Sequence, residues 1–268
     1  MSEIHVKHIK SHIEENFTNL IDLSDLKAKG TNLENFFLTR ALAAYSIQHH
    51  TQIPTNIAAE SVVDGGNDNG IDAIYYDVHT KCLYIVQSKW IHSGKGEPEN
   101  GEVKKFISGI KDLLNFRFDR FNDKVRKKEV IIQNAVCDPK TKYQIILTYT
   151  GINNLADPSR RDFSDFLEEL NDASELVYLS VFNQTRIHSS LIHTTENIQL
   201  IDQTIQLKHF GKVTEPYNGY YGQVNGIEIY GWWDKYRKRL FAKNIRGVLG
   251  DTDVNKDIRR KSRAFLVL

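Results

Sequence analysis

Two β-like segments that are only three residues apart constrain this chain more than any other feature. Residues 71–78 read IDAIYYDV and residues 82–90 read CLYIVQSKW, with HTK between them. Apolar, β-branched and aromatic residues on both sides of so short a turn predict an antiparallel hairpin. The second segment is almost continuously apolar and then ends in polar residues. Because buried polar side chains cost free energy unless they are paired or bind something, this is either an ordinary hairpin or a metal site.

The segments around the hairpin predict an α/β fold. Helical spacing of apolar residues predicts helices over residues 31–50, 102–116 and 157–171, and β-rich composition predicts strands over 56–64, 142–150 and 175–183. The resulting order, with three strands between the first two helices, predicts a mixed sheet flanked by helices. Beyond about residue 195 the pattern changes to turns and short strands. We therefore divide the chain into an N-terminal helical segment (1–29), an α/β domain (30–195) and the start of a β-rich domain (196–268).

Composition and charge narrow the class of protein. A hydrophobic fraction of 40% and a charged fraction of 26% are those of a soluble globular protein. No apolar run approaches the length that spans a bilayer, and the N-terminus lacks the apolar core of a signal peptide. We therefore expect a cytoplasmic protein that does not contact membranes. Basic clusters at 124–128, 234–246 and 259–263 are either solvated helix faces or contacts for phosphate backbones.

The hairpin gathers residues suited to metal chemistry. Antiparallel pairing brings Asp72, at the start of the first strand, near Gln87 and Lys89 at the end of the second, and strand alternation puts Ser88 on the other face. Mg²⁺ prefers oxygen ligands, which an aspartate and a glutamine supply. A lysine can orient the attacking water or stabilise charge on a phosphate. We therefore predict a Mg²⁺ site, able to take Mn²⁺, for phosphodiester hydrolysis.

A further acid is expected at this site, and the sequence offers several. Glu34, on the helix before the hairpin, would reach the same ion or a second one if that helix packs across the sheet. Glu60 and Asp64 are alternatives that lie closer in sequence, and Asp68 is assigned to the Gly-rich turn. We predict Asp72, Gln87 and Glu34 as metal ligands, and the same three residues with Lys89 as the catalytic set. Each residue alone is more often structural, so the prediction depends on the combination.

The motifs resemble those of a nuclease superfamily. GIDAIYY resembles the acid-bearing strand, and VQSKW the E-x-K strand, of the PD-(D/E)XK (restriction-endonuclease-like) nucleases, whose core runs α-β-β-β-α-β. Gln87 stands where that family usually has Glu or Asp, which removes a charge from the metal site, although the Mrr-like restriction endonucleases share a Q-x-K version. The resemblance implies a metal-dependent endonuclease acting on DNA, and a homodimer.

A second resemblance covers about residues 70–258. NGIDAIYYD and LYIVQSKW, followed downstream by YRKRLFAKNIRGVLGDTDVNKDI, resemble the abortive-infection phage-resistance (AIPR-type) proteins. This resemblance implies bacterial defence against phage, a trigger derived from the phage, and a second domain that is truncated here. The alternatives are a catalytically weak nuclease-fold module that binds nucleic acid or a phage or partner protein, and a sensor whose second domain recognises a phage component.

Overall fold

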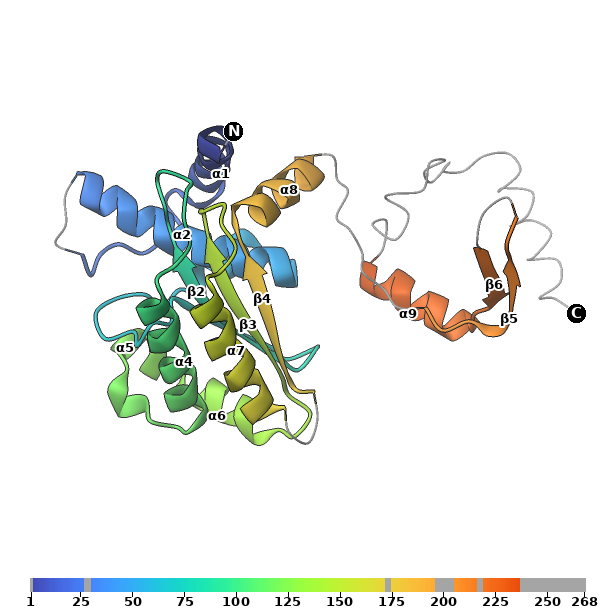
Figure 1. Cartoon of the computed structure of the whole chain (residues 1–268). Helices are drawn as coiled ribbons and strands as arrows, with labels where there is room; N and C mark the ends of the chain where they lie inside the picture. The colour runs from blue at the N-terminus through green and yellow to red at the C-terminus, as the bar shows by residue number, and fades with distance from the viewer. Residues whose placement is uncertain (1, 27–29, 172–174, 196–204, 216–218, 237–268) are drawn as a thin grey trace, which may run out of the picture. The chain divides into compact units, whose positions relative to one another are not determined.

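The computed structural model describes residues 2–26, 30–171, 175–195, 205–215 and 219–236 (Figure 1). Contacts between residues divide the chain into two units, residues 1–191 and 192–268. We describe each unit by itself.

The first unit is built on a four-stranded mixed sheet. Its strands are β1 (Ala73–Asp77), β2 (Cys82–Lys89), β3 (Lys142–Tyr149) and β4 (Val177–Phe182), adjacent in that order. β1 and β2 are antiparallel, with Ala73 opposite Val86, whereas β2, β3 and β4 are parallel. The predicted hairpin is thus confirmed. Asp77 stabilises its turn, because its carboxylate accepts a hydrogen bond of 2.9 Å from the main-chain N–H of His79.

Helices cover both faces of this sheet (Figure 1). Val86 and Ile146 point to the face packed by α1, α2, α3 and α8, whereas their strand neighbours Ile85 and Ile145 point to the face packed by α4, α6 and α7. This alternation explains why the strands read as nearly continuous apolar runs. The helices are α1 (Ser2–Phe17), α2 (Thr31–Thr51), α3 (Thr55–Glu60), α4 (Asn100–Leu114), α5 (Asp123–Arg126), α6 (Glu129–Cys137), α7 (Asp157–Leu170) and α8 (Gln184–Thr195), with a 3₁₀ turn at Phe118–Arg120.

The coarse fold prediction is confirmed: the protein is mixed α/β, and helices flank a four-stranded mixed sheet. The strand predicted over residues 56–64 is wrong, because that segment forms the short helix α3. Pro54 precedes the helix with φ near the value that proline imposes, and Ala58 and Ala59 favour helix. Only an isolated bridge between Val62 and Ala73 remains of the first of the three expected strands.

The N-terminal segment belongs to the first unit by its contacts. Ile9, Ile13 and Phe17 of α1 are fully buried and pack in the same core cluster as α2. Helix α1 therefore adds a layer to the α/β core.

In the second unit the described residues form a two-stranded antiparallel sheet, β5 (Lys208–Val213) with β6 (Gly219–Gln223), and helix α9 (Gly226–Tyr236). The prediction of turns and short strands beyond about residue 195 is wrong for α9, which is helical. Asn225 explains the helix, because its side-chain oxygen accepts a hydrogen bond of 3.0 Å from the main-chain N–H of Ile227.

Candidate functional site

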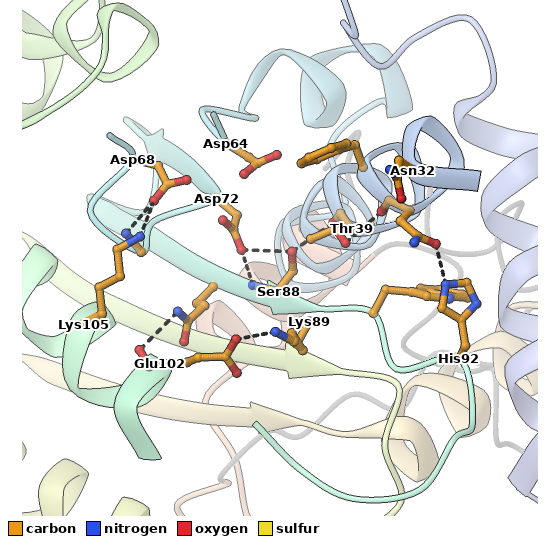
Figure 2. Close-up of a pocket in the computed structure, with 15 residues that line it drawn as sticks. Asn32, Thr39, Asp64, Asp68, Asp72, Ser88, Lys89, His92, Glu102 and Lys105 are labelled. Atoms are coloured by element: carbon orange, nitrogen blue, oxygen red, sulfur yellow. Dashed lines mark hydrogen bonds and ion pairs between the residues drawn. The ribbon is translucent and has the colours of Figure 1, made fainter. Parts of the chain in front are cut away.

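A pocket of about 620 Å³ lies at the end of β2 (Figure 2). Four segments line it: the first half of α2, the loop before β1, the end of β2 with the residues that follow, and the first turns of α4. Its volume falls within the range of about 300–1,000 Å³ that is usual for small-molecule sites. Polar side chains from all four segments converge on it, as Figure 2 shows.

The loop before β1 has the shape that its Gly- and Asn-rich sequence favours. Asn67, Asn69 and Gly70 have φ values of 59°, 55° and 81°, in the left-handed region that Asn and Gly tolerate best. Asp68 accepts a hydrogen bond of 2.7 Å from the main-chain N–H of Gly70, so the predicted role of Asp68 in the turn is confirmed. The repeated left-handed residues fold the loop back on itself.

This folding brings three carboxylates together. Asp64, Asp68 and Asp72 each offer an oxygen, and these oxygens lie within 4.8 Å of one another (Figure 2). Lys105 of α4 forms an ion pair of 3.1 Å with Asp68. The three acids are four residues apart in sequence, so the loop presents them as one cluster at the pocket wall.

Asp72 is the most buried of the three acids, with 7% of its surface exposed. Its Oδ2 accepts hydrogen bonds from the main-chain N–H of Ser88 (2.6 Å) and from the Ser88 hydroxyl (3.0 Å). Burial raises the pKa of Asp72 well above its ordinary value, and the charges of Asp64 and Asp68 act in the same direction. Burial also raises the pKa of Asp64, against the effect of Arg40. A bound cation would offset both the burial and the repulsion.

Gln87 and Lys89 both contact Glu102 of α4. The Gln87 amide donates a hydrogen bond of 3.3 Å to the main-chain oxygen of Glu102, and the Lys89 ammonium forms an ion pair with the Glu102 carboxylate. Gln87 is 9% exposed, and among the described residues none donates to its buried Oε1. An unpartnered buried acceptor in a wall of this pocket calls for a ligand, because burial without a hydrogen bond is costly.

The donor set fits a hard divalent cation. Three carboxylates and one amide oxygen are the ligand types that Mg²⁺ and Mn²⁺ take in proteins. The unpartnered Oε1 of Gln87 and the clustered carboxylates both favour binding of such a cation.

The structure brings three of the four predicted site residues to this pocket. Asp72, Gln87 and Lys89 line it, whereas Glu34 forms an ion pair with Lys10 of α1, outside the set of described residues that line the pocket. The Lys10 ammonium lowers the pKa of Glu34. Of the alternative acids, Asp64 lines the pocket, and Glu60 is exposed on α3 beside another hollow.

Sequence reasoning gave too little weight to three residues. Asp68 was assigned to the turn alone, although it also belongs to the acidic cluster, and the repeat of Asp at 64, 68 and 72 was the signal for it. Ser88 was placed on the opposite face, yet its main-chain N–H and hydroxyl hold Asp72. Glu102 carried no local signal, because only the packing of α4 against the end of β2 brings it here.

The basic clusters are described in part. Lys124 donates a hydrogen bond of 3.1 Å to the main-chain oxygen of Asp64, and Lys128 donates one of 3.1 Å to that of Glu60. The basic cluster at 124–128 therefore stabilises the loop before β1 and the end of α3. Residues 237–246 and 259–263, and with them most of the downstream motif, lie outside the described residues. Among the described helices, none is long and apolar enough to cross a membrane.

Comparison with known proteins yields no relative: no family model, no curated protein and no solved structure matches this chain. Functional assignment therefore depends on the chemistry of the pocket and on the sequence motifs.

Proposed function

We propose that this protein is a metal-dependent phosphodiester hydrolase, an endonuclease whose active site is the pocket at the end of β2. One observation carries the proposal: the carboxylates of Asp64, Asp68 and Asp72 lie within 4.8 Å of one another in a pocket that also contains Lys89. Clustered acids beside a lysine are the parts that metal-assisted phosphodiester hydrolysis needs.

The proposed metal ligands are the three aspartates and the amide oxygen of Gln87. Mg²⁺ or Mn²⁺, when bound, would activate a water molecule and stabilise negative charge on the phosphate. Ser88 fixes the carboxylate of Asp72 through two hydrogen bonds, so this ligand is held in place before the ion arrives. Glu34 is left out of the proposed ligand set because its carboxylate pairs with Lys10.

Lys89 is the proposed cation for the phosphate and the attacking water. Its side chain is 46% exposed, so the ammonium can reach a substrate in the pocket. Glu102 orients this ammonium by an ion pair, and the main-chain oxygen of Glu102 is in turn bonded by Gln87. Gln87, Lys89 and Glu102 thus form one connected group on the α4 side of the pocket.

The test is cleavage of supercoiled plasmid with Mg²⁺ or Mn²⁺ against EDTA. We expect nicking by the wild type, and a loss of about 100-fold or more in Asp72→Asn and Lys89→Met, because each variant removes a group that acts on the ion or the phosphate. Asp138→Asn is the matched control, because Asp138 pairs with Lys81 at the opposite end of β2. Equal cleavage by Asp72→Asn and wild type would refute the site.

A second candidate is a nuclease-fold module that binds nucleic acid with little or no cleavage. Two observations favour it: Gln87 contributes no charge to the pocket, and Lys89 is already paired with Glu102. DNA binding that weakens with salt, without metal-dependent cleavage, would support this candidate. The choice of DNA as substrate, the homodimer, the phage trigger and the role in phage defence are proposed on the sequence resemblances alone.

A further inference from the structure

Arg40 of α2 is a wholly buried cation behind the acidic cluster. Its side chain has 0% of its surface exposed. The guanidinium Nε donates to Asp64 Oδ2 at 2.7 Å, and Nη2 donates to the main-chain oxygen of Asp64 at 3.0 Å. One edge of the planar guanidinium, which we call the fork, therefore bonds both the side chain and the main chain of Asp64.

The other edge of the fork bonds Asp22 and Asp25, which lie between α1 and α2. Nη1 and Nη2 donate to the two carboxylate oxygens of Asp25 at 2.7 and 2.8 Å, and Nη1 also donates to the main-chain oxygen of Asp22 at 2.6 Å. All five N–H groups of Arg40 are thus engaged. Burying a guanidinium is expensive unless every donor is satisfied and opposite charge is near, and both conditions are met here.

The arrangement needs an arginine specifically. A planar fork with five donors can hold two carboxylates and two carbonyl oxygens at fixed angles, whereas a lysine ammonium has three donors at a single point. Lys124 supports the same assembly with an ion pair of 3.3 Å to Asp25 and a hydrogen bond of 3.1 Å to the main-chain oxygen of Asp64.

We propose that Arg40 is a positioning residue for Asp64 in the metal site. Asp25 contributes to the same site indirectly, because it holds the Arg40 guanidinium in place. Arg40 holds one oxygen of the Asp64 carboxylate, which fixes the direction of the carboxylate toward Asp68 and Asp72. Groups that orient metal ligands are worth about 10- to 100-fold in metal affinity. This inference rests on the proposed metal site, and it assigns a role to residues that lie outside the pocket.

The test compares Mn²⁺ binding by the full chain, measured by electron paramagnetic resonance well below the melting temperature. Arg40→Lys keeps the charge and removes the fork, and we expect its dissociation constant for Mn²⁺ to rise about 10-fold. Asp25→Asn loosens the fork from outside the pocket, and we expect a smaller rise in the same direction. The Asp138→Asn control should bind as the wild type does.

The melting temperature separates positioning from a purely structural role. If Arg40→Lys melts lower than wild type but binds Mn²⁺ equally well when folded, Arg40 only stabilises the fold and the inference is wrong. If Arg40→Lys does not fold, Asp25→Asn decides: unchanged Mn²⁺ affinity overturns the inference, and weaker affinity supports it. Wild type that binds no Mn²⁺ would overturn the metal site itself, and with it this role for Arg40.

Discussion

Gly109 of α4 offers a sharp test of how the acidic loop is positioned. A Cβ at this position would lie against the main-chain oxygen of Asn69, closer than two such atoms can approach, and 3.2 Å from the Asn69 carbonyl carbon. The loop and the helix are therefore in contact through their backbones, and a side chain at 109 must push the loop away. Because the loop carries Asp64, Asp68 and Asp72, we expect Gly109→Ala to disturb both stability and the proposed metal site.

The magnitude follows from two opposing effects. Alanine in a helix interior is favoured over glycine by about 1 kcal/mol. Overpacking usually costs about 1–3 kcal/mol, and the upper end applies here because the obstructing atoms belong to a backbone. The expected net loss is about 2 kcal/mol, or a fall of about 6 °C in melting temperature for a unit of this size.

Gly101 of the same helix is the matched control, because a Cβ there would meet nothing within 4 Å. Gly101→Ala should leave the melting temperature unchanged or raise it slightly. Urea unfolding gives the free energies, and Mn²⁺ titration reports the site. If Gly109→Ala is as stable as Gly101→Ala and binds Mn²⁺ as the wild type does, the loop is not held by this contact and the reasoning fails.

Three further predictions concern buried polar groups. Burial lowers the pKa of His49 to about 4. The stability that the neutral His49 side chain contributes is therefore complete above about pH 6.5 and falls by roughly 3 kcal/mol as the pH approaches 4. In urea unfolding measured across this pH range, His49→Gln should lose less stability than the wild type. Burial disfavours the charged form of Asp72 and raises its pKa, and Asp72→Asn removes this cost. We therefore expect Asp72→Asn to have a higher melting temperature than the wild type in EDTA and no further rise with Mg²⁺. Gln87→Glu cannot donate to the Glu102 carbonyl, so it should lose about 1–3 kcal/mol in EDTA and gain more than wild type from Mg²⁺.

The first and third of these predictions have a control with similar chemistry elsewhere. His79→Gln changes an exposed histidine in the hairpin turn and should leave the acid unfolding curve as it is. Gln144→Glu, on β3, removes an amide that donates to the main-chain oxygen of Tyr178 on β4 at 3.3 Å, so it should cost stability without any gain from Mg²⁺. A lower melting temperature for Asp72→Asn in EDTA would contradict the second prediction, and equal responses of Gln87→Glu and Gln144→Glu to Mg²⁺ would contradict the third.

The sequence predicted the features that depend on residues close together in the chain. The hairpin follows from a short turn between two apolar segments, and its register, set by the four turn residues 78–81, is why Asp72 lies across from the end of β2. Helix α3 was missed because a six-residue segment offers too few turns for periodicity to distinguish helix from strand. Helix α9 was missed because its start depends on one Asn cap within a stretch rich in β-forming residues.

The parts of the site that escaped prediction depend on packing between distant segments. Glu34 lies on the predicted helix, but α1 packs beside that helix and brings Lys10 to its carboxylate. Arg40 occupies an apolar-looking helical position, and only the fold shows that it faces Asp25 and Asp64. Partners separated by 15 or more residues leave no pattern in a single sequence.

The amide at Gln87 has a physical reason once α4 is considered. A carboxylate in its place would face the main-chain oxygen of Glu102, to which it cannot donate, and would add to the charge of the Glu102 side chain. The amide satisfies that oxygen and still leaves Oε1 as an acceptor in the pocket wall. The negative charge that an acid at 87 would bring is available instead from Asp64 and Asp68, on the same loop as Asp72. The Q-x-K motif is therefore compatible with a charged metal site, because one nine-residue loop concentrates the acids that two strands would otherwise share.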